Sequence, residues 1–239
     1  MHREYHRWFS PSLGRDMELL QFGHAGARVL VFPSSMGRFH EWEDQGMIEA
    51  LAPMIEQGWF QLWCVNSVDA DSWYAKWKHP ADRARQQGLY DAYLYHEVLP
   101  LTEHRNPGTF LVTTGASFGA YHAMAFGLRH PDKVGRIIGL SGIYDIREQT
   151  DGYSDDNVYF HNPADFILHE HDPARLAAIR NIDIIIAIGR DDGMRPGNED
   201  FSRRLESRGI WHALRIWDGW AHDWPYWRDM IRTYIGGHD

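Results

Sequence analysis

The stretch TTGASFGAYHA, residues 113–123, decides the fold. It sets Ser117 between two glycines in a Gly-x-Ser-x-Gly pattern, directly after the apolar residues 110–112. Apolar side chains then recur at helical spacing up to Leu128. A strand, a sharp turn and a helix in this order predict a bend that lifts a serine hydroxyl above the edge of a sheet. A turn serine and a serine tolerated in a core are the alternatives, and the flanking strand and helix favour a nucleophile.

The rest of the chain alternates short apolar runs with amphipathic segments. The first 28 residues suit an antiparallel hairpin. Apolar runs that predict strands lie at residues 28–32, 59–65, 110–113, 136–140, 182–188 and 211–217. Helical periodicity lies within residues 44–57, 90–101, 120–128 and 227–234. This alternation predicts one α/β domain over residues 1–239, with a mostly parallel central sheet, an antiparallel N-terminal start and helices on both faces.

One segment interrupts the alternation. Residues 144–172 are polar, aromatic and rich in histidine, without a clear period. Segments of this length in compact domains are usually functional or disordered, and the tyrosines and phenylalanines here favour an ordered excursion. We expect it to form a lid-like cover over the carboxyl edge of the sheet, where open α/β sheets bind ligands.

A nucleophilic serine needs a histidine to take its proton, and that histidine needs an acid to orient it. In hydrolases of this architecture the acid and then the histidine follow the serine along the chain, each at the carboxyl end of a strand. Three histidines follow the excursion along the chain, namely His212, His222 and His238. His212 falls inside the predicted last strand and His238 lies beside the terminus, so His222 is the candidate base.

Three aspartates could orient that histidine. Asp191 and Asp192 follow the strongly apolar strand at 182–188, and Asp145 follows the strand at 136–140. Adjacent side chains leave the backbone in different directions, so only one of the pair should reach the imidazole. We rank Asp192 first, Asp191 second and Asp145 third. Each could instead bond its own backbone in a turn.

Composition narrows the classes of partner. The chain has 33 acidic and 24 basic residues and a formal charge of −9, which argues against a nucleic-acid ligand. No apolar run approaches the roughly 18 residues that a membrane span needs, and Cys64 sits in an apolar run that suits a small buried side chain. We expect a cytoplasmic protein that binds neither nucleic acid nor membrane, with homo-oligomerisation left open. His161, His169 and His171 lack an accompanying Cys or carboxylate pattern, so we expect no metal and no cofactor.

Taken together, these residues resemble the esterase branch of the α/β-hydrolases, which includes S-formylglutathione hydrolase (esterase D), feruloyl esterases, enterochelin esterases and mycolyltransferases. The resemblance covers nearly the whole chain. It rests on GASFGAYHA, on RHPDKVGRIIGLSGIYD after it, and on IGRDD followed by AHDWPYW. It implies the α/β-hydrolase fold and a triad of Ser117, Asp192 and His222, in which the acid lies three residues beyond the strand-ending Gly189.

A tetrahedral intermediate also needs donors for its oxyanion. The amide of Phe118 opens the helix after the bend, where unpaired amides and the helix dipole favour negative charge. Alignment with the family implies the amide of Met36 as the second donor, with Ser35 as the alternative. The relatives commonly carry His-Gly where this chain has Ser34 and Ser35.

Aromatic residues flank the predicted site, namely Trp73, Tyr74, Tyr144 and Trp220. They either line a substrate pocket or simply pack. The expected activity is hydrolysis of a small-molecule carboxylic ester through an acyl-enzyme. Acyl transfer or thioester hydrolysis on the same triad, and a non-catalytic binding protein on the same fold, are the alternatives.

Overall fold

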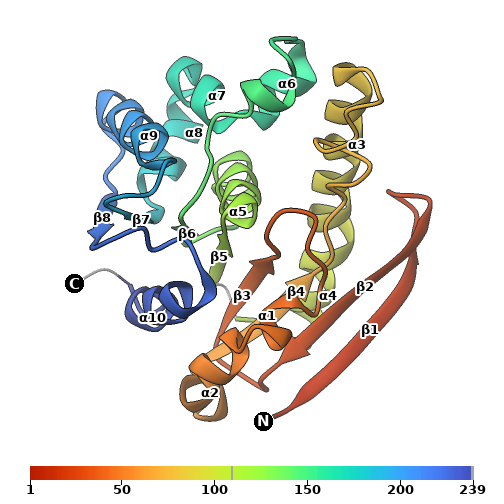
Figure 1. Ribbon diagram of the computed structural model, residues 1–239. Helices are drawn as coiled ribbons and strands as arrows, with labels where there is room; N and C mark the ends of the chain where they lie inside the picture. The colour runs from red at the N-terminus through yellow and green to blue at the C-terminus, as the bar shows by residue number, and fades with distance from the viewer. Residues whose placement is uncertain (109, 238–239) are drawn as a thin grey trace.

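An eight-stranded sheet organises the computed structural model, which describes residues 1–108 and 110–237 (Figure 1). The strands lie in the order β1-β2-β4-β3-β5-β6-β7-β8. Their bounds are β1 Arg3–Ser10, β2 Arg15–Phe22, β3 Ala27–Phe32, β4 Phe60–Val65, β5 Leu111–Ala116, β6 Arg136–Leu140, β7 Asp183–Gly189 and β8 Ala213–Trp217. β1 and β2 form the expected antiparallel hairpin, β2 pairs antiparallel with β4, and the other pairings are parallel. The predicted fold class is confirmed.

Helices cover both faces of the sheet (Figure 1). Their bounds are α1 Glu41–Asp44, α2 Met47–Glu56, α3 Pro80–Tyr93, α4 Leu99–Arg105, α5 Phe118–Arg129, α6 Asp156–His161, α7 Pro163–His169, α8 Pro173–Arg180, α9 Arg195–Ser207 and α10 Trp224–Tyr234. Side chains alternate across β3: Leu30 and Phe32 join the core under α3, α5 and α9, whereas Val29 and Val31 join the core under α2 and α10. The sheet is therefore buried on both sides, which explains its unbroken apolar strands.

The excursion at residues 144–172 is ordered and contains α6 and α7. α6 packs against α3, and α7 packs against α5 and α9. The hydroxyl of Tyr121 donates to the carbonyl of His161 (2.9 Å), and the amide of Ala164 donates to the carbonyl of Tyr144 (3.1 Å). These contacts fix the excursion to α5 and to the segment after β6.

Several boundaries differ from the sequence expectation, and the starts of α3 and β8 are two of them. The helix expected at 90–101 begins at Pro80, because proline suits a first helical turn and the ring of His79 accepts the amide of Ala81 (3.2 Å). β8 begins at Ala213, so His212 lies just before the strand, where its Nε2 is 2.6 Å from Ser202 Oγ. His238 lies outside the described residues. Cys64 is buried, as expected, and among residues 1–108 and 110–237 no helix has the length and apolar character to cross a bilayer.

Candidate active site

Ser117 stands at a strained bend between β5 and α5. Its backbone has φ 54° and ψ −118°, a conformation that costs energy for a residue with a side chain. A Cβ on Gly115 would come within 2.4 Å of the backbone of Gly119, and a Cβ on Gly119 would come within 2.5 Å of the carbonyl oxygen of Pro33. The two glycines are therefore required by close backbone approach. The bend is held by the Ser117 amide, which donates to the carbonyl of Leu140 at the end of β6 (2.8 Å).

Asp192 and His222 form a hydrogen-bonded pair. Nδ1 of His222 lies 2.7 Å from Oδ2 of Asp192, while Oδ1 of Asp192 accepts the amide of Met194 (2.9 Å). The Asp192 side chain is buried and that of His222 is only slightly exposed. An ionised carboxylate only accepts, so Nδ1 of His222 carries the proton and Nε2 is left as an acceptor. This is the tautomer that a general base requires.

The other two candidate acids are engaged elsewhere. Asp191 is exposed, and its described hydrogen bond is made by its amide, which donates to the carbonyl of Gly219 (3.0 Å). The carboxylate of Asp145 accepts from Arg147 (2.8 Å) and from Asn162 (3.1 Å). Of the three aspartates, the one ranked first is the one that meets His222.

Ser141, directly after β6, ties β7 and the segments that follow β8 together at the carboxyl edge of the sheet. Its backbone has φ 50°, and its amide donates to the carbonyl of Ala187 in β7 (2.7 Å). Its hydroxyl donates to the carbonyl of Ala221 (3.1 Å) and accepts from Nε1 of Trp227 (3.0 Å). The Trp227 ring in turn lies 5.2 Å from that of His222. Ser117, Asp192 and His222 thus follow β5, β7 and β8 at one edge, and Ser141 positions the loop that carries the histidine.

Sequence reasoning missed Ser141. Its only signal is a place directly after the strand at 136–140, which many structural serines share. Its role depends on a strained backbone and on two partners about 80 residues further on, Ala221 and Trp227.

The amide expected as the second oxyanion donor is already bonded. The Met36 amide donates to Oδ2 of Asp69 (2.9 Å), although its backbone has the positive φ (60°) of a special turn. In the same loop, the Ser34 amide donates to Glu41 (2.7 Å) and the Gly37 amide donates to the carbonyl of Ser34 (2.9 Å). Pro33 has no amide hydrogen. Within the described part of the chain, the Ser35 amide is the one N–H of this loop without a partner. The hydrogen bonding favours Ser35 over Met36.

The four aromatic candidates separate into core and rim. Trp73 is fully buried and its Nε1 donates to the Tyr121 hydroxyl (2.9 Å): the loop after β4 turns it into the core, which favours packing over a place in a pocket wall. Tyr74 donates its hydroxyl to Ser35 Oγ (2.7 Å); burial raises the pKa of this tyrosine, and the hydrogen bond with Ser35 opposes the rise. Trp220 is 53% exposed and its ring stacks on that of His222 at 5.6 Å.

Tyr144 lies in the wall of a cavity near Asp192. It is buried, stacks on Phe201 at 4.7 Å and lines a cavity of about 420 Å³. Gly142, after β6, and Met194, two residues beyond Asp192, line the same cavity. This cavity lies between the segments that follow β6 and β7, and it is a candidate binding site for part of a substrate.

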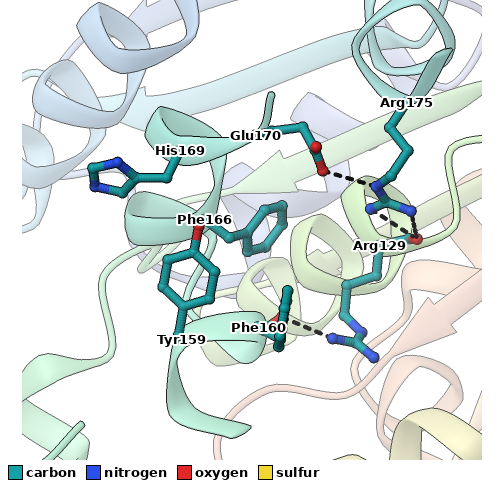
Figure 2. Close-up of a pocket in the computed structure, with 7 residues that line it drawn as sticks. All are labelled: Arg129, Tyr159, Phe160, Phe166, His169, Glu170 and Arg175. Carbon is teal, nitrogen blue, oxygen red and sulfur yellow. Dashed lines mark hydrogen bonds and ion pairs between the residues drawn. The ribbon is translucent and has the colours of Figure 1, made fainter. Parts of the chain in front are cut away.

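A second cavity, of about 560 Å³, lies beyond the far end of α5 (Figure 2). Aromatic side chains of α6 and α7 line it together with Arg129 and Arg175. Arg129 donates to the carbonyl of Phe160 (3.0 Å) and Arg175 donates to Glu170 (2.8 Å), so both guanidinium groups are engaged. The described lining residues include no serine or cysteine. The described lining of this cavity therefore offers no serine or cysteine nucleophile.

The histidines of the excursion do not gather. His161 is buried beside α3, His169 lines the cavity of Figure 2, and His171 is exposed. Burial lowers the pKa of His161 to about 3. Among residues 1–108 and 110–237 there is no group of three His, Cys, Asp or Glu side chains arranged to hold a metal ion.

Comparisons with solved structures agree with this fold. The fold is similar to a ferulic acid esterase, with a TM-score of 0.77 and 18% identity over 96% of this chain and 95% of that chain. It is similar to the Staphylococcus aureus fluorophosphonate-binding serine hydrolase FphF, with a TM-score of 0.70 and 18% identity over 98% of this chain and 97% of that chain. It is also similar to an S-formylglutathione hydrolase from Agrobacterium tumefaciens, with a TM-score of 0.72 and 14% identity over 96% of this chain and 91% of that chain.

Sequence comparison identifies the family. No curated protein sequence matches the chain. Residues 63–235 match the family described as Putative esterase, and this span contains Ser117, Asp192 and His222. The resemblance inferred from the motifs is confirmed: the chain belongs to the Putative esterase family and is an esterase of the α/β-hydrolase superfamily.

Proposed function

We propose that this esterase is a serine carboxylic-ester hydrolase that works through an acyl-enzyme on Ser117. The observation that carries the proposal is the 2.7 Å pair of Asp192 and His222, set at the same edge of the sheet as a strained serine. Strain of this kind persists only where the surrounding structure over-determines it, and here two glycines and a hydrogen bond to β6 hold it.

The proposed proton route follows from the tautomer of His222. Nδ1–H donates to Asp192, so Nε2 accepts the proton of Ser117 Oγ as that oxygen bonds to the ester carbonyl carbon. The carbonyl oxygen becomes an oxyanion, and the imidazolium is stabilised by the buried Asp192 carboxylate. The C–O bond to the alcohol then breaks, and Nε2 gives its proton to the departing oxygen. Water repeats the sequence on the acyl-enzyme and releases the acid.

The oxyanion would be held by the amide of Phe118 and by one amide of the loop at residues 33–37. Phe118 is the first residue of α5, where amides lack acceptors within the helix. Met36 could donate only by exchanging its bond with Asp69, whereas the Ser35 amide has no partner among the described residues. Tyr74, Tyr144 and the exposed Trp220 are the proposed walls for a small ester.

Thioester hydrolysis and acyl transfer on the same triad differ only in the leaving group or in the acceptor that resolves the acyl-enzyme. A thioester panel, and product analysis with competing alcohols, separate them from ester hydrolysis. The pair of Asp192 and His222 lies at the same edge of the sheet as the strained Ser117, which argues against a non-catalytic binding protein, because binding alone does not require a serine, an imidazole and a carboxylate to be brought to one edge.

The experiment that tests the proposal is replacement of Ser117 by Ala, assayed on p-nitrophenyl acetate. We expect turnover to fall by about 10⁴ or more, because the nucleophile is lost while the site stays folded. Ser154→Ala is the matched control, since Ser154 is exposed in the excursion, and it should keep wild-type turnover. A Ser117→Ala protein that keeps more than about a tenth of the wild-type rate would refute the assignment.

A further inference from the structure

A buried carboxylate behind the candidate site has no part in the proposed proton route. Asp69 lies in the loop after β4 and is fully buried. Its Oδ1 is 2.8 Å from Nε2 of His122, and its Oδ2 accepts the amide of Met36 (2.9 Å). A buried charge is costly unless it is paired or hydrogen-bonded, and here both oxygens have a partner. We therefore ask which neighbouring groups the hydrogen bonds of this carboxylate hold in place.

His122 is the partner that fixes the direction of this carboxylate. It lies on α5, five residues after Ser117, and its Nδ1 is 3.5 Å from Nε2 of Gln87 on α3. An amide nitrogen only donates, so Nδ1 accepts and Nε2 carries the proton that goes to Asp69. Four of the described aromatic rings lie 5.0–5.9 Å from the imidazole: Phe32, Tyr90, Phe118 and Tyr121. The carboxylate is thereby tied to the helix that carries the nucleophile.

The loop on the other side of Asp69 is a tight turn. The Gly37 amide donates to the carbonyl of Ser34 (2.9 Å), and the positive φ falls on the third residue, Met36. This is the pattern of a type II turn, in which the amides of the second and third residues are not used by the turn itself. Asp69 takes the amide of Met36, which leaves the amide of Ser35.

Ser35 is linked to the first residue of α5 through Tyr74. Its Oγ accepts from the hydroxyl of Tyr74 (2.7 Å), and the Tyr74 ring packs edge-on against that of Phe118 at 5.1 Å. The loop itself reaches α5 at Pro33, whose carbonyl oxygen would lie 2.5 Å from a Cβ on Gly119. The amide without a described partner is therefore in a loop that packs against the start of α5, where the expected first oxyanion donor lies.

We infer that Asp69 is a positioning residue for ester hydrolysis: it holds the Met36 peptide so that the Ser35 amide is the second oxyanion donor. Asp69 is fully buried and touches no substrate, so it acts through the shape of the turn. His122 keeps its carboxylate aimed at Met36. This inference rests on the proposed hydrolysis through Ser117 and adds which loop amide serves and what sets its position.

The first test replaces Asp69 by Ala, with Asp71→Ala as the matched control. Asp71 lies two residues along the same loop, and its described ion pair is with Arg15 at the surface. We expect Asp69→Ala to lower kcat on p-nitrophenyl acetate by about 10²- to 10³-fold, the usual effect of one lost oxyanion donor, with KM within about threefold. Affinity for a phenylalkyl trifluoromethyl ketone, whose hemiketal oxyanion occupies the same donors, should fall by a similar factor.

A conservative variant provides a rescue that a general loss of packing would not predict. In Asp69→Asn, Oδ1 can still accept from Met36 while Nδ2 donates to His122. The His122 ring then shifts its proton to Nδ1 and donates to Oε1 of Gln87, a buried oxygen that has no partner in the native arrangement. We expect this variant to recover kcat to within about tenfold of wild type.

The second test addresses the amide itself and does not depend on the folding of Asp69→Ala. Proline suits the second position of a type II turn, so Ser35→Pro removes the N–H with little cost to the turn. Ser35→Ala keeps the N–H and loses only the hydroxyl. Ser35→Ala is therefore the reference for the loss of the N–H, and we expect kcat of Ser35→Pro to lie about 10²- to 10³-fold below that of Ser35→Ala.

Three results would overturn the inference: Asp69→Ala that is folded by circular dichroism and keeps both kcat and ketone affinity, Asp69→Ala with raised kcat, or Ser35→Pro with the activity of Ser35→Ala. A raised kcat would mean that Asp69 masks the Met36 amide. Failure of the underlying hydrolysis looks different, since wild type itself would then show no turnover that depends on Ser117.

Discussion

Replacement of Asp192 by Asn examines the candidate acid without changing its size. In the native structure Oδ1 of Asp192 accepts the amide of Met194 (2.9 Å) and Oδ2 faces Nδ1 of His222 (2.7 Å). An Asn that keeps its carbonyl on the Met194 amide must point its NH₂ group at Nδ1. Nδ1 then becomes an acceptor, the ring proton moves to Nε2, and Nε2 can no longer take the proton of Ser117.

The structure therefore predicts that Asp192→Asn traps the wrong tautomer. In serine hydrolases with this triad, that error lowers kcat by about 10⁴, or about 5.4 kcal/mol of transition-state free energy. Binding of the ester does not use the tautomer, so KM should change little.

The assay is steady-state hydrolysis of p-nitrophenyl acetate at neutral pH, with the adjacent Asp191→Asn as the matched control. Asp191 is exposed and its amide, not its carboxylate, makes the described bond to Gly219, so that variant should stay within about twofold of wild type. The reasoning is refuted if folded Asp192→Asn keeps turnover within tenfold of wild type, or if Asp191→Asn is impaired as severely.

Three further predictions concern Gly119, His161 and Trp220. Gly119→Ala puts a Cβ within about 2.5 Å of the backbone at Pro33, so urea unfolding should show a loss of about 1–3 kcal/mol, whereas Gly197→Ala in α9, with open space around it, should show none. Burial lowers the pKa of His161 to about 3, so between pH 6.5 and 3 the unfolded chain binds a proton that the folded chain does not. Wild type should lose stability as pH falls through this window, by up to about 1.4 kcal/mol per pH unit, and His161→Gln should show a flatter profile; equal slopes would contradict the prediction. Trp220→Ala removes the ring stacked on His222 and should lower kcat/KM by about 3- to 30-fold, corresponding to roughly 0.5–2 kcal/mol, while an unchanged kcat/KM would count against a role in the site.

The sheet and the bend were predictable because they depend on local patterns. An apolar run that suits a strand precedes Ser117, and apolar residues at helical spacing follow it. The two glycines mark the close approach between the backbones of this strand and this helix. His222 followed from its place after the last strand, and Asp192 was ranked ahead of Asp191 and Asp145. The structure pairs Asp192 with His222.

The features that the sequence does not predict depend on contacts between loops that are far apart along the chain. Asp69 and His122 are 53 residues apart, and nothing in their local surroundings separates a buried pair from two ordinary polar residues. The loop after β4 also turns Trp73 inward, and the sequence alone leaves open whether this residue lines a pocket or packs. The short helices of the excursion span only six and seven residues, too few turns to show a period, and α6 is started by the side chain of Asp155.

Labelling with a fluorophosphonate probe, followed by peptide mapping, tests the central claim most directly. The phosphorus reacts with an activated serine oxygen and with little else on a folded protein, so the label reports both activation and position. We predict one label on the peptide that contains Ser117, absent from Ser117→Ala and strongly slowed in Asp192→Asn. A folded wild-type protein that takes no label, or takes it on another serine, would contradict the proposed nucleophile.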